Sequence, residues 1–152
     1  MYQYQVSFGE AVSRAFSKYC DFTGRASRSE FWYFYLLNFI VSIGIAFVSL
    51  IFGYKSLTAY YILTILWGLI TLLPYLGLMV RRLHDTGRSG VNLLWAFLPI
   101  AGPIVLLVFF CQDSQMFPNR FGDVPNLKDN NRNPNGGYPQ NPYNNQNPNN
   151  WQ

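Results

Sequence analysis

The sequence is poor in the residues that bind metals, form disulfides or carry charge. Its 152 residues include one histidine and two cysteines, and charged residues make up 12% of the chain. Soluble domains carry roughly 25% charged residues. Protein zinc sites need three or four clustered ligands, so a lone histidine with Cys20 and Cys111 far apart in the chain argues against a metal centre. We therefore expect no metal and no other cofactor.

The chain also lacks the patterns that usually accompany catalysis. No G-x-S-x-G nucleophile motif is present. The single histidine, His84, directly precedes Asp85. Neighbouring residues on a helix point in different directions, so these two side chains do not form an orienting pair. We expect a protein that is not an enzyme.

The chain is rich in long apolar segments that carry no charge. Half of its residues are hydrophobic, and three long segments contain no charged residue: 31–52, 58–80 and 91–111. A membrane-spanning helix needs about 20 predominantly apolar residues to cross about 30 Å of hydrocarbon, and all three segments are long enough. The weaker alternative, a soluble core, would need three consecutive helices without a polar face. The sequence therefore predicts an all-α integral membrane protein with three transmembrane helices.

Residues 7–20 show a different pattern, in which apolar side chains recur every three or four positions. Glu10, Arg14 and Lys18 follow one another at four-residue intervals on the other side. This spacing predicts a short amphipathic helix that lies on the membrane surface. The alternative is that its apolar stripe packs against loops of the protein itself. Because this stretch lacks the apolar core of a secretory signal, we expect the first span to remain as an uncleaved anchor.

The composition changes completely near residue 126. Residues 126–152 consist mainly of asparagine, proline, glycine and glutamine, with a few aromatic residues. Such a segment cannot bury enough apolar surface to fold, and we expect it to be disordered. The predicted organisation is a membrane domain, residues 1–125, followed by a disordered Asn/Pro-rich C-terminal tail, residues 126–152.

The most polar stretch between the apolar segments is RRLHDTGRSG, residues 81–90. Each charged side chain placed at the centre of a bilayer would cost about 2.5–3.5 kcal/mol, so this stretch is expected outside the hydrocarbon. Arg81 and Asp85 are four residues apart and can pair on a helix. Gly87 suits the left-handed position that ends a helix. We expect a polar connection between the second and third spans.

Basic residues concentrate on one side of the predicted membrane domain. Seven of them flank the first two spans on that side: Arg14, Lys18, Arg25, Arg28, Arg81, Arg82 and Arg88. An excess of basic residues marks the cytoplasmic side, which predicts a multi-pass plasma-membrane protein with a cytoplasmic N-terminus. Ser27 and Glu30 have the spacing of a capping box that begins the first spanning helix.

Two topologies are open for the third apolar segment. Pro99 and the Gly102-Pro103 pair interrupt it near its middle. A full crossing would place the later motif NRFG, residues 119–122, opposite the basic residues, whereas a re-entrant hairpin would return it to them. Irregular backbone exposed to lipid is strongly unfavourable, and so few helices offer little cover for a turn. We therefore expect a full crossing.

Three motifs occur in a fixed order around the apolar segments: FTGRASRSEFWYF, RRLHDTGRSG and NRFG. Their order and spacing resemble those of the bacterial inner-membrane family called domain of unknown function 805, over about residues 20–125. The glycine-threonine link that usually precedes NRFG in that family is replaced here by QDSQMFP. The resemblance implies a small integral protein of the bacterial inner membrane, and it implies no activity.

Eight ionisable side chains share one predicted interfacial layer: Arg25, Arg28, Glu30, Arg81, Arg82, His84, Asp85 and Arg88. One interpretation is that they anchor the topology and form one or two structural salt bridges. The other is an anion site, because arginine presents a planar fork to phosphate and a phospholipid headgroup is the nearest anion. We take the second as the working hypothesis: a protein that binds an anionic lipid headgroup or a protein partner at this cytoplasmic interface.

A small oligomeric transport or channel component is the second hypothesis. Transporters usually carry polar or ionisable residues inside their spans, whereas the first span here offers Asn38 and the second Thr64 and Thr71. Nucleic-acid binding is not expected, because the basic residues cluster beside the membrane segments instead of forming an extended stripe. The expected partners are membrane lipids, further copies of the chain or another membrane protein.

Overall fold

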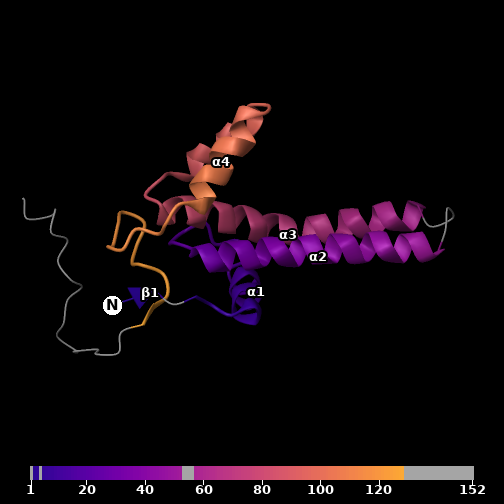
Figure 1. The fold of residues 1–152 in the computed structure, drawn as a ribbon, viewed down its shortest axis with the longest axis horizontal. Helices are drawn as coiled ribbons and strands as arrows, with labels where there is room; N and C mark the ends of the chain where they lie inside the picture. The colour runs from indigo at the N-terminus through magenta and orange to yellow at the C-terminus, as the bar shows by residue number, and fades with distance from the viewer. Residues whose placement is uncertain (1, 4, 53–56, 129–152) are drawn as a thin grey trace, which may run out of the picture.

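The computed structural model describes residues 2–3, 5–52 and 57–128, and the predicted disordered tail lies almost entirely outside the described residues. In chain order the elements are β1 (Tyr2–Gln3), α1 (Phe8–Ser17), α2 (Arg28–Phe52), α3 (Leu57–Asp85), the 3₁₀ helix η2 (Gly90–Phe97), α4 (Ala101–Cys111) and β2 (Leu127–Lys128). Figure 1 shows α2 and α3 side by side along the longest axis, with α1 crossing near one end. Helix α4 diverges from that same end.

The two longest helices are long and apolar enough to cross a membrane. They provide the candidate spans Arg28–Ile51 and Leu57–Asp85. Only 6% and 22% of the most apolar stretch of each helix is buried inside the protein, whereas a core helix of a soluble protein would be mostly buried. The first two predicted spans are therefore confirmed as long apolar helices, and each extends to include its flanking arginines.

The prediction of a third spanning helix over residues 91–111 is wrong. This segment is divided into η2 and α4, which pack against each other around a turn. Ile100 in the turn has a left-handed backbone conformation, with φ of 68°. Pro99 lacks the N–H that a continuous helix would need. A side chain on Gly102 would collide with the Trp95 carbonyl oxygen, so glycine permits the close approach of the two helices.

The chain after α4 returns to the side that holds the N-terminus. Strand β2 pairs antiparallel with β1, with Tyr2 opposite Lys128 and Gln3 opposite Leu127. Two strands on opposite faces of a bilayer cannot pair, so the residues that follow α4 lie on the same side as those that precede α2. The chain that precedes α2 and the chain that follows α4 therefore meet at one end of the molecule, the arrangement that the re-entrant alternative predicts.

Helix α1 confirms the predicted amphipathic helix, but its apolar stripe does not face lipid or loops. The stripe packs against α2 and α3. Ala11 and Ala15 are fully buried, and the Phe16 ring meets the Phe34 ring edge-to-face at 5.6 Å. Aromatic residues of the first turns of α2 supply the apolar surface that this stripe contacts. The interpretation of α1 as a helix that buries its stripe in the membrane surface is therefore corrected.

The hydrophobic core lies at the end where α1, α2, α3 and α4 meet. Its buried members are Ala15, Ala26, Phe31, Phe34, Leu78, Leu83, Leu106 and Phe110. Toward the other end, α2 and α3 expose large apolar side chains such as Phe47, Leu50 and Ile65. The protein thus consists of a packed body from which two apolar helices extend.

Tyr19 replaces a hydrogen bond that Pro74 removes from α3. Proline has no N–H, so the Ile70 carbonyl four residues earlier loses its helical donor, and the Tyr19 hydroxyl donates to this oxygen at 2.7 Å. We expect Tyr19→Phe to lower the free energy of unfolding by about 1 kcal/mol, measurable as a lower melting temperature in detergent. Tyr61→Phe, at an exposed tyrosine of α3, is the control, and equal melting temperatures for both variants would contradict this role of Tyr19.

Candidate functional site

The loop between α1 and α2 is ordered by two local caps. Asp21 Oδ1 accepts hydrogen bonds from the Thr23 backbone N–H at 2.9 Å and from its hydroxyl at 2.5 Å. The bond from the hydroxyl is the main reason that the pKa of Asp21 lies below its usual value. Ser27 Oγ then accepts from the Glu30 N–H at 3.3 Å, as the capping-box spacing predicts. Arg25 is held between these two caps.

Helix α3 ends at the glycine that the sequence singles out. The Gly87 N–H donates to the His84 oxygen and the Arg88 N–H to the Leu83 oxygen, both at 2.9 Å. These two bonds form a Schellman cap, in which the residue after the helix is left-handed. Gly87 has φ of 78°, so the predicted helix end is confirmed.

Asp85, at the end of α3, is the centre of a buried charge cluster. Its Oδ1 accepts a hydrogen bond from Arg25 Nε at 3.0 Å and forms an ion pair with Arg25 Nη2 at 2.9 Å. Its Oδ2 pairs with Nη1 of Arg82, and all three side chains are almost completely buried. The Arg81–Asp85 pair that helical spacing allows does not form, because Arg81 faces Glu30 instead.

Arg25 and Arg82 use their remaining donors to hold the chain that follows α4. Arg82 donates from Nε to the Phe110 oxygen at 3.2 Å and from Nη2 to the Gln112 oxygen. Arg25 donates from Nη1 to the Phe117 oxygen at 2.9 Å. The last carbonyl groups of a helix lack donors within the helix, so Arg82 caps α4 while Arg25 fixes the loop beyond it.

The NRFG motif lies directly against the RRLHDTGRSG motif. Asn119 and Gly122 at its ends bond to each other through their backbone N–H and carbonyl groups. The Asn119 amide donates to the His84 carbonyl oxygen at 2.9 Å, and the Phe121 ring stacks on the His84 ring at 3.8 Å. The predicted placement of NRFG on the opposite side is therefore wrong, and all three sequence motifs meet at one place.

Glu30 and Arg81 form a second buried pair, with looser geometry. Arg81 Nη1 and Glu30 Oε1 are 3.8 Å apart, and both side chains are almost fully buried. These two atoms and Arg81 Nη2 have no hydrogen-bond partner among the described residues. Arg81 Nε donates to the Gly77 oxygen at 3.3 Å. The pair joins α2 to α3, but it is less fully hydrogen-bonded than the cluster around Asp85.

Arg28 and Arg88 lie at the edge of this polar region. Arg88 donates to Gln112 Oε1 at 2.5 Å and lies over the Phe109 ring, 4.1 Å from its centroid. Arg28 pairs with Asp113, and this pair is open to the surroundings: 48% of the Arg28 side chain and 91% of the Asp113 side chain are exposed. Arg28 is the member of the predicted eight-residue site with an exposed side chain, and the others are buried or half-buried.

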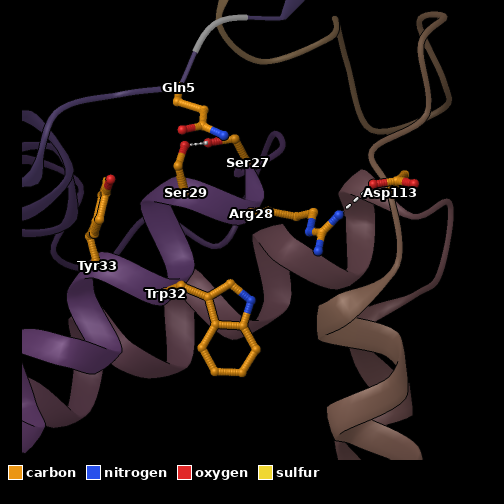
Figure 2. A pocket seen from close by; sticks show the side chains of 7 residues that line it. All are labelled: Gln5, Ser27, Arg28, Ser29, Trp32, Tyr33 and Asp113. Carbon is orange, nitrogen blue, oxygen red and sulfur yellow. Dashed lines mark hydrogen bonds and ion pairs between the residues drawn. The ribbon is translucent and has the colours of Figure 1, made fainter.

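A polar pocket of about 460 Å³ opens beside Arg28, at the start of α2. It is lined by Gln5, Ser27, Arg28, Ser29, Trp32, Tyr33 and Asp113. Figure 2 shows Arg28 reaching toward Asp113 on one side, the Trp32 ring below, and Tyr33 across the pocket. The pocket combines a guanidinium, a carboxylate, hydroxyls and two aromatic rings, and we call it the headgroup-level pocket.

Two of the side chains that complete this region were not predicted from the sequence. Asp113 and Gln112 belong to the QDSQMFP link, which a full crossing would place on the opposite side of the membrane. The available signal was the break at Pro99 and Gly102-Pro103, which is compatible with a hairpin that returns these residues to the basic motifs. Within the described part of the chain, no group of three or more His, Cys, Asp or Glu side chains is placed to hold a metal ion.

Two long apolar helices, a short apolar hairpin and a polar body at one end define a small α-helical membrane protein. The chain matches the family described as Protein of unknown function (DUF805) over residues 19–123, more than half of its length, and it belongs to that family. The resemblance predicted from the three motifs is thereby confirmed.

The relatives of this chain are named as inner membrane proteins. Inner membrane protein YhaI of Escherichia coli strain K12 is 46% identical over 112 residues, which cover 74% of this chain and 92% of that protein. Inner membrane protein YhaH of the same strain is 35% identical over 115 residues, which cover 76% of this chain and 95% of that protein. No solved structure matches the chain.

Proposed function

We propose that this protein is a non-enzymatic inner-membrane protein that binds a phospholipid by its headgroup in the headgroup-level pocket. The observation that carries the proposal is the exposed Arg28 guanidinium, which lines a pocket at the point where the apolar surface of α2 begins. Arginine offers phosphate a planar pair of N–H donors. Trp32 and Tyr33 line the same pocket, and such side chains prefer the headgroup level.

The buried charges of the cluster support the pocket instead of contacting the ligand. Arg25, Arg82 and Asp85 are bonded to one another and to backbone carbonyl groups. An anion that entered there would have to displace these bonds. By holding the chain that follows α4, they position Asp113 at the pocket rim.

The proposed side of the membrane is cytoplasmic. Arg14, Arg25, Arg28 and Arg82 all form ion pairs within the body, at one end of the two candidate spans. A concentration of basic residues marks the cytoplasmic side of membrane proteins. A phospholipid bound by Arg28 would then come from the inner leaflet.

A transport component has less support from the described residues. Three polar side chains of the spans bond to their own helices: Asn38 donates to the Phe34 oxygen, Ser42 to the Asn38 oxygen and Thr71 to the Trp67 oxygen. Side chains used in this way offer a passing solute few free donors.

The pocket is tested by lipid retention in Arg28 variants. We expect Arg28→Ala to lower the affinity for phospholipid about tenfold or more, because it removes charge-assisted hydrogen bonds. Arg28→Lys should recover only part of this loss, since lysine keeps the charge but cannot form a forked contact. The measurement is native mass spectrometry of the detergent-purified protein, with retained lipid counted per chain.

Arg120→Ala is the matched control for this experiment. Arg120 is exposed at the same end of the molecule, where it lies over the Phe121 ring, and it does not line the pocket. A generic basic residue near an anionic leaflet contributes about 1 kcal/mol, so its loss should have a smaller effect than the loss of Arg28. Equal lipid retention in Arg28→Ala and wild-type protein would reject the proposed function.

A further inference from the structure

The headgroup-level pocket carries both signs of charge. Arg28 and Asp113 lie side by side at its rim, and the Asp113 carboxylate is 91% exposed. A simple anion would be attracted by the guanidinium and repelled by the carboxylate. A headgroup with a phosphate and an ammonium group, separated by a short carbon chain, would be attracted by both. The charge pattern of the pocket is therefore complementary to a zwitterionic headgroup.

The ion pair does not block the pocket to such a ligand. Exposed ion pairs contribute roughly 0–1 kcal/mol, so Arg28 and Asp113 can separate and each take a partner of opposite charge from the headgroup at little cost. The Trp32 and Tyr33 rings line the same pocket, and aromatic faces also attract ammonium groups.

A separate apolar groove shares one lining residue with the pocket. It has a volume of about 340 Å³ and runs between the body helices α2 and α3 and the hairpin of η2 and α4, where Figure 1 shows α4 diverging from α3. Trp32 lines both the pocket and the groove. Tyr75 and Met79 line the groove from α3, and Leu107 and Phe110 line it from α4. A polar pocket and an apolar groove on either side of one shared residue, Trp32, suit a lipid with a charged head and an acyl chain.

We infer that the ligand is a zwitterionic aminophospholipid, with its phosphate on Arg28, its ammonium group on Asp113 and one acyl chain in the groove. This inference rests on the proposed function, because it needs a headgroup bound at Arg28. It adds to that function a preference for one class of headgroup and a binding position for one acyl chain. Asp113 is then the residue that distinguishes an aminophospholipid from an anionic one.

The selectivity is tested with a lipid mixture. Purified protein is incubated with equal amounts of phosphatidylethanolamine and phosphatidylglycerol that carry identical acyl chains, and the bound lipids are counted by native mass spectrometry. Wild-type protein should bind the ethanolamine lipid in roughly three- to fivefold excess, the size expected for an exposed ion pair. Asp113→Asn should bring the ratio close to one, because it lowers the amount of bound ethanolamine lipid and no longer repels the glycerol lipid.

The groove is tested by filling it. Leu107→Trp should lower the amount of both lipids and leave their ratio unchanged, because it occupies the acyl-chain path and not the pocket. Ile104→Trp places the same side chain on the same helix, at an exposed position that does not line the groove, and should behave like wild type. Equal lipid binding by these two variants would remove the groove from the site.

The failures of the two proposals can be told apart. Full lipid retention by Arg28→Ala overturns the proposed function, and the present inference with it. If Arg28→Ala loses lipid but the wild-type protein binds both headgroups equally, or Asp113→Asn keeps the preference, only the assignment of the ammonium group to Asp113 is overturned.

Discussion

Asp85→Ala is expected to lower the free energy of unfolding by about 3–5 kcal/mol, the cost of removing one partner from a buried ion pair. The carboxylate is the common partner of Arg25 and Arg82, and all three side chains are almost completely buried. Without it, two guanidinium groups would stay in the interior with carbonyl oxygens as their partners. The measurement is the melting temperature of the detergent-purified protein, which should fall well below that of wild type.

The same substitution should release the chain that follows α4. Arg25 and Arg82 hold this chain through carbonyl groups from Phe110 to Phe117, and their own positions depend on Asp85. We therefore expect trypsin to cleave Asp85→Ala after Arg120, an exposed residue of that chain, faster than it cleaves the wild-type protein.

Asp113→Ala is the control for stability, because it also removes a carboxylate that pairs with an arginine. The Arg28–Asp113 pair is exposed, so its loss should cost at most about 1 kcal/mol. If Asp85→Ala and Asp113→Ala melted at the same temperature, the buried cluster would not be the structural centre of the body.

The parts of the fold that depend on local patterns were predictable from the sequence. Long uncharged runs indicate the two long helices, the S-x-x-E spacing indicates the start of α2, and Gly87 indicates the end of α3. Each of these signals acts over one helix or one turn. The structure changes the helix limits by only a few residues, because the flanking arginines also take helical conformation.

The partners within the site were not predictable, because they depend on which helices pack together. Helical spacing allows Asp85 to pair with Arg81 or with Arg82, and the sequence contains no means of choosing between them. In the structure, Arg81 lies 3.8 Å from Glu30 of α2 and not beside Asp85. Asp85 pairs in addition with Arg25, which approaches it from the loop before α2.

The third apolar segment is a second case in which the sequence pattern alone does not determine the structure. Its 21 residues, 91–111, satisfy the length rule for a span, and cover for a turn is scarce in so small a protein. The structure forms two halves instead, and each rises only about 16 Å, from eight residues of 3₁₀ helix and eleven residues of α-helix. A hairpin of this length would reach about halfway through a hydrocarbon layer of about 30 Å. Phe97 and Ile100 at its tip are exposed, which suits contact with lipid chains.

Single-cysteine labelling distinguishes this hairpin from a full crossing. In a background with Cys20 and Cys111 replaced by serine, one cysteine at a time is placed at position 20, at Asp123 or at Lys55, which lies between α2 and α3 in the sequence. Because β1 pairs with β2, positions 20 and 123 should both react with a membrane-impermeant thiol reagent only after the cells are opened, whereas position 55 should react in intact cells. If positions 20 and 123 both reacted in intact cells, the hairpin would stand and the proposed orientation would be reversed. If position 123 reacted in intact cells and position 20 did not, the third apolar segment would cross the membrane. The contacts of Arg25 and Arg82 with the chain beyond α4 would then be wrong.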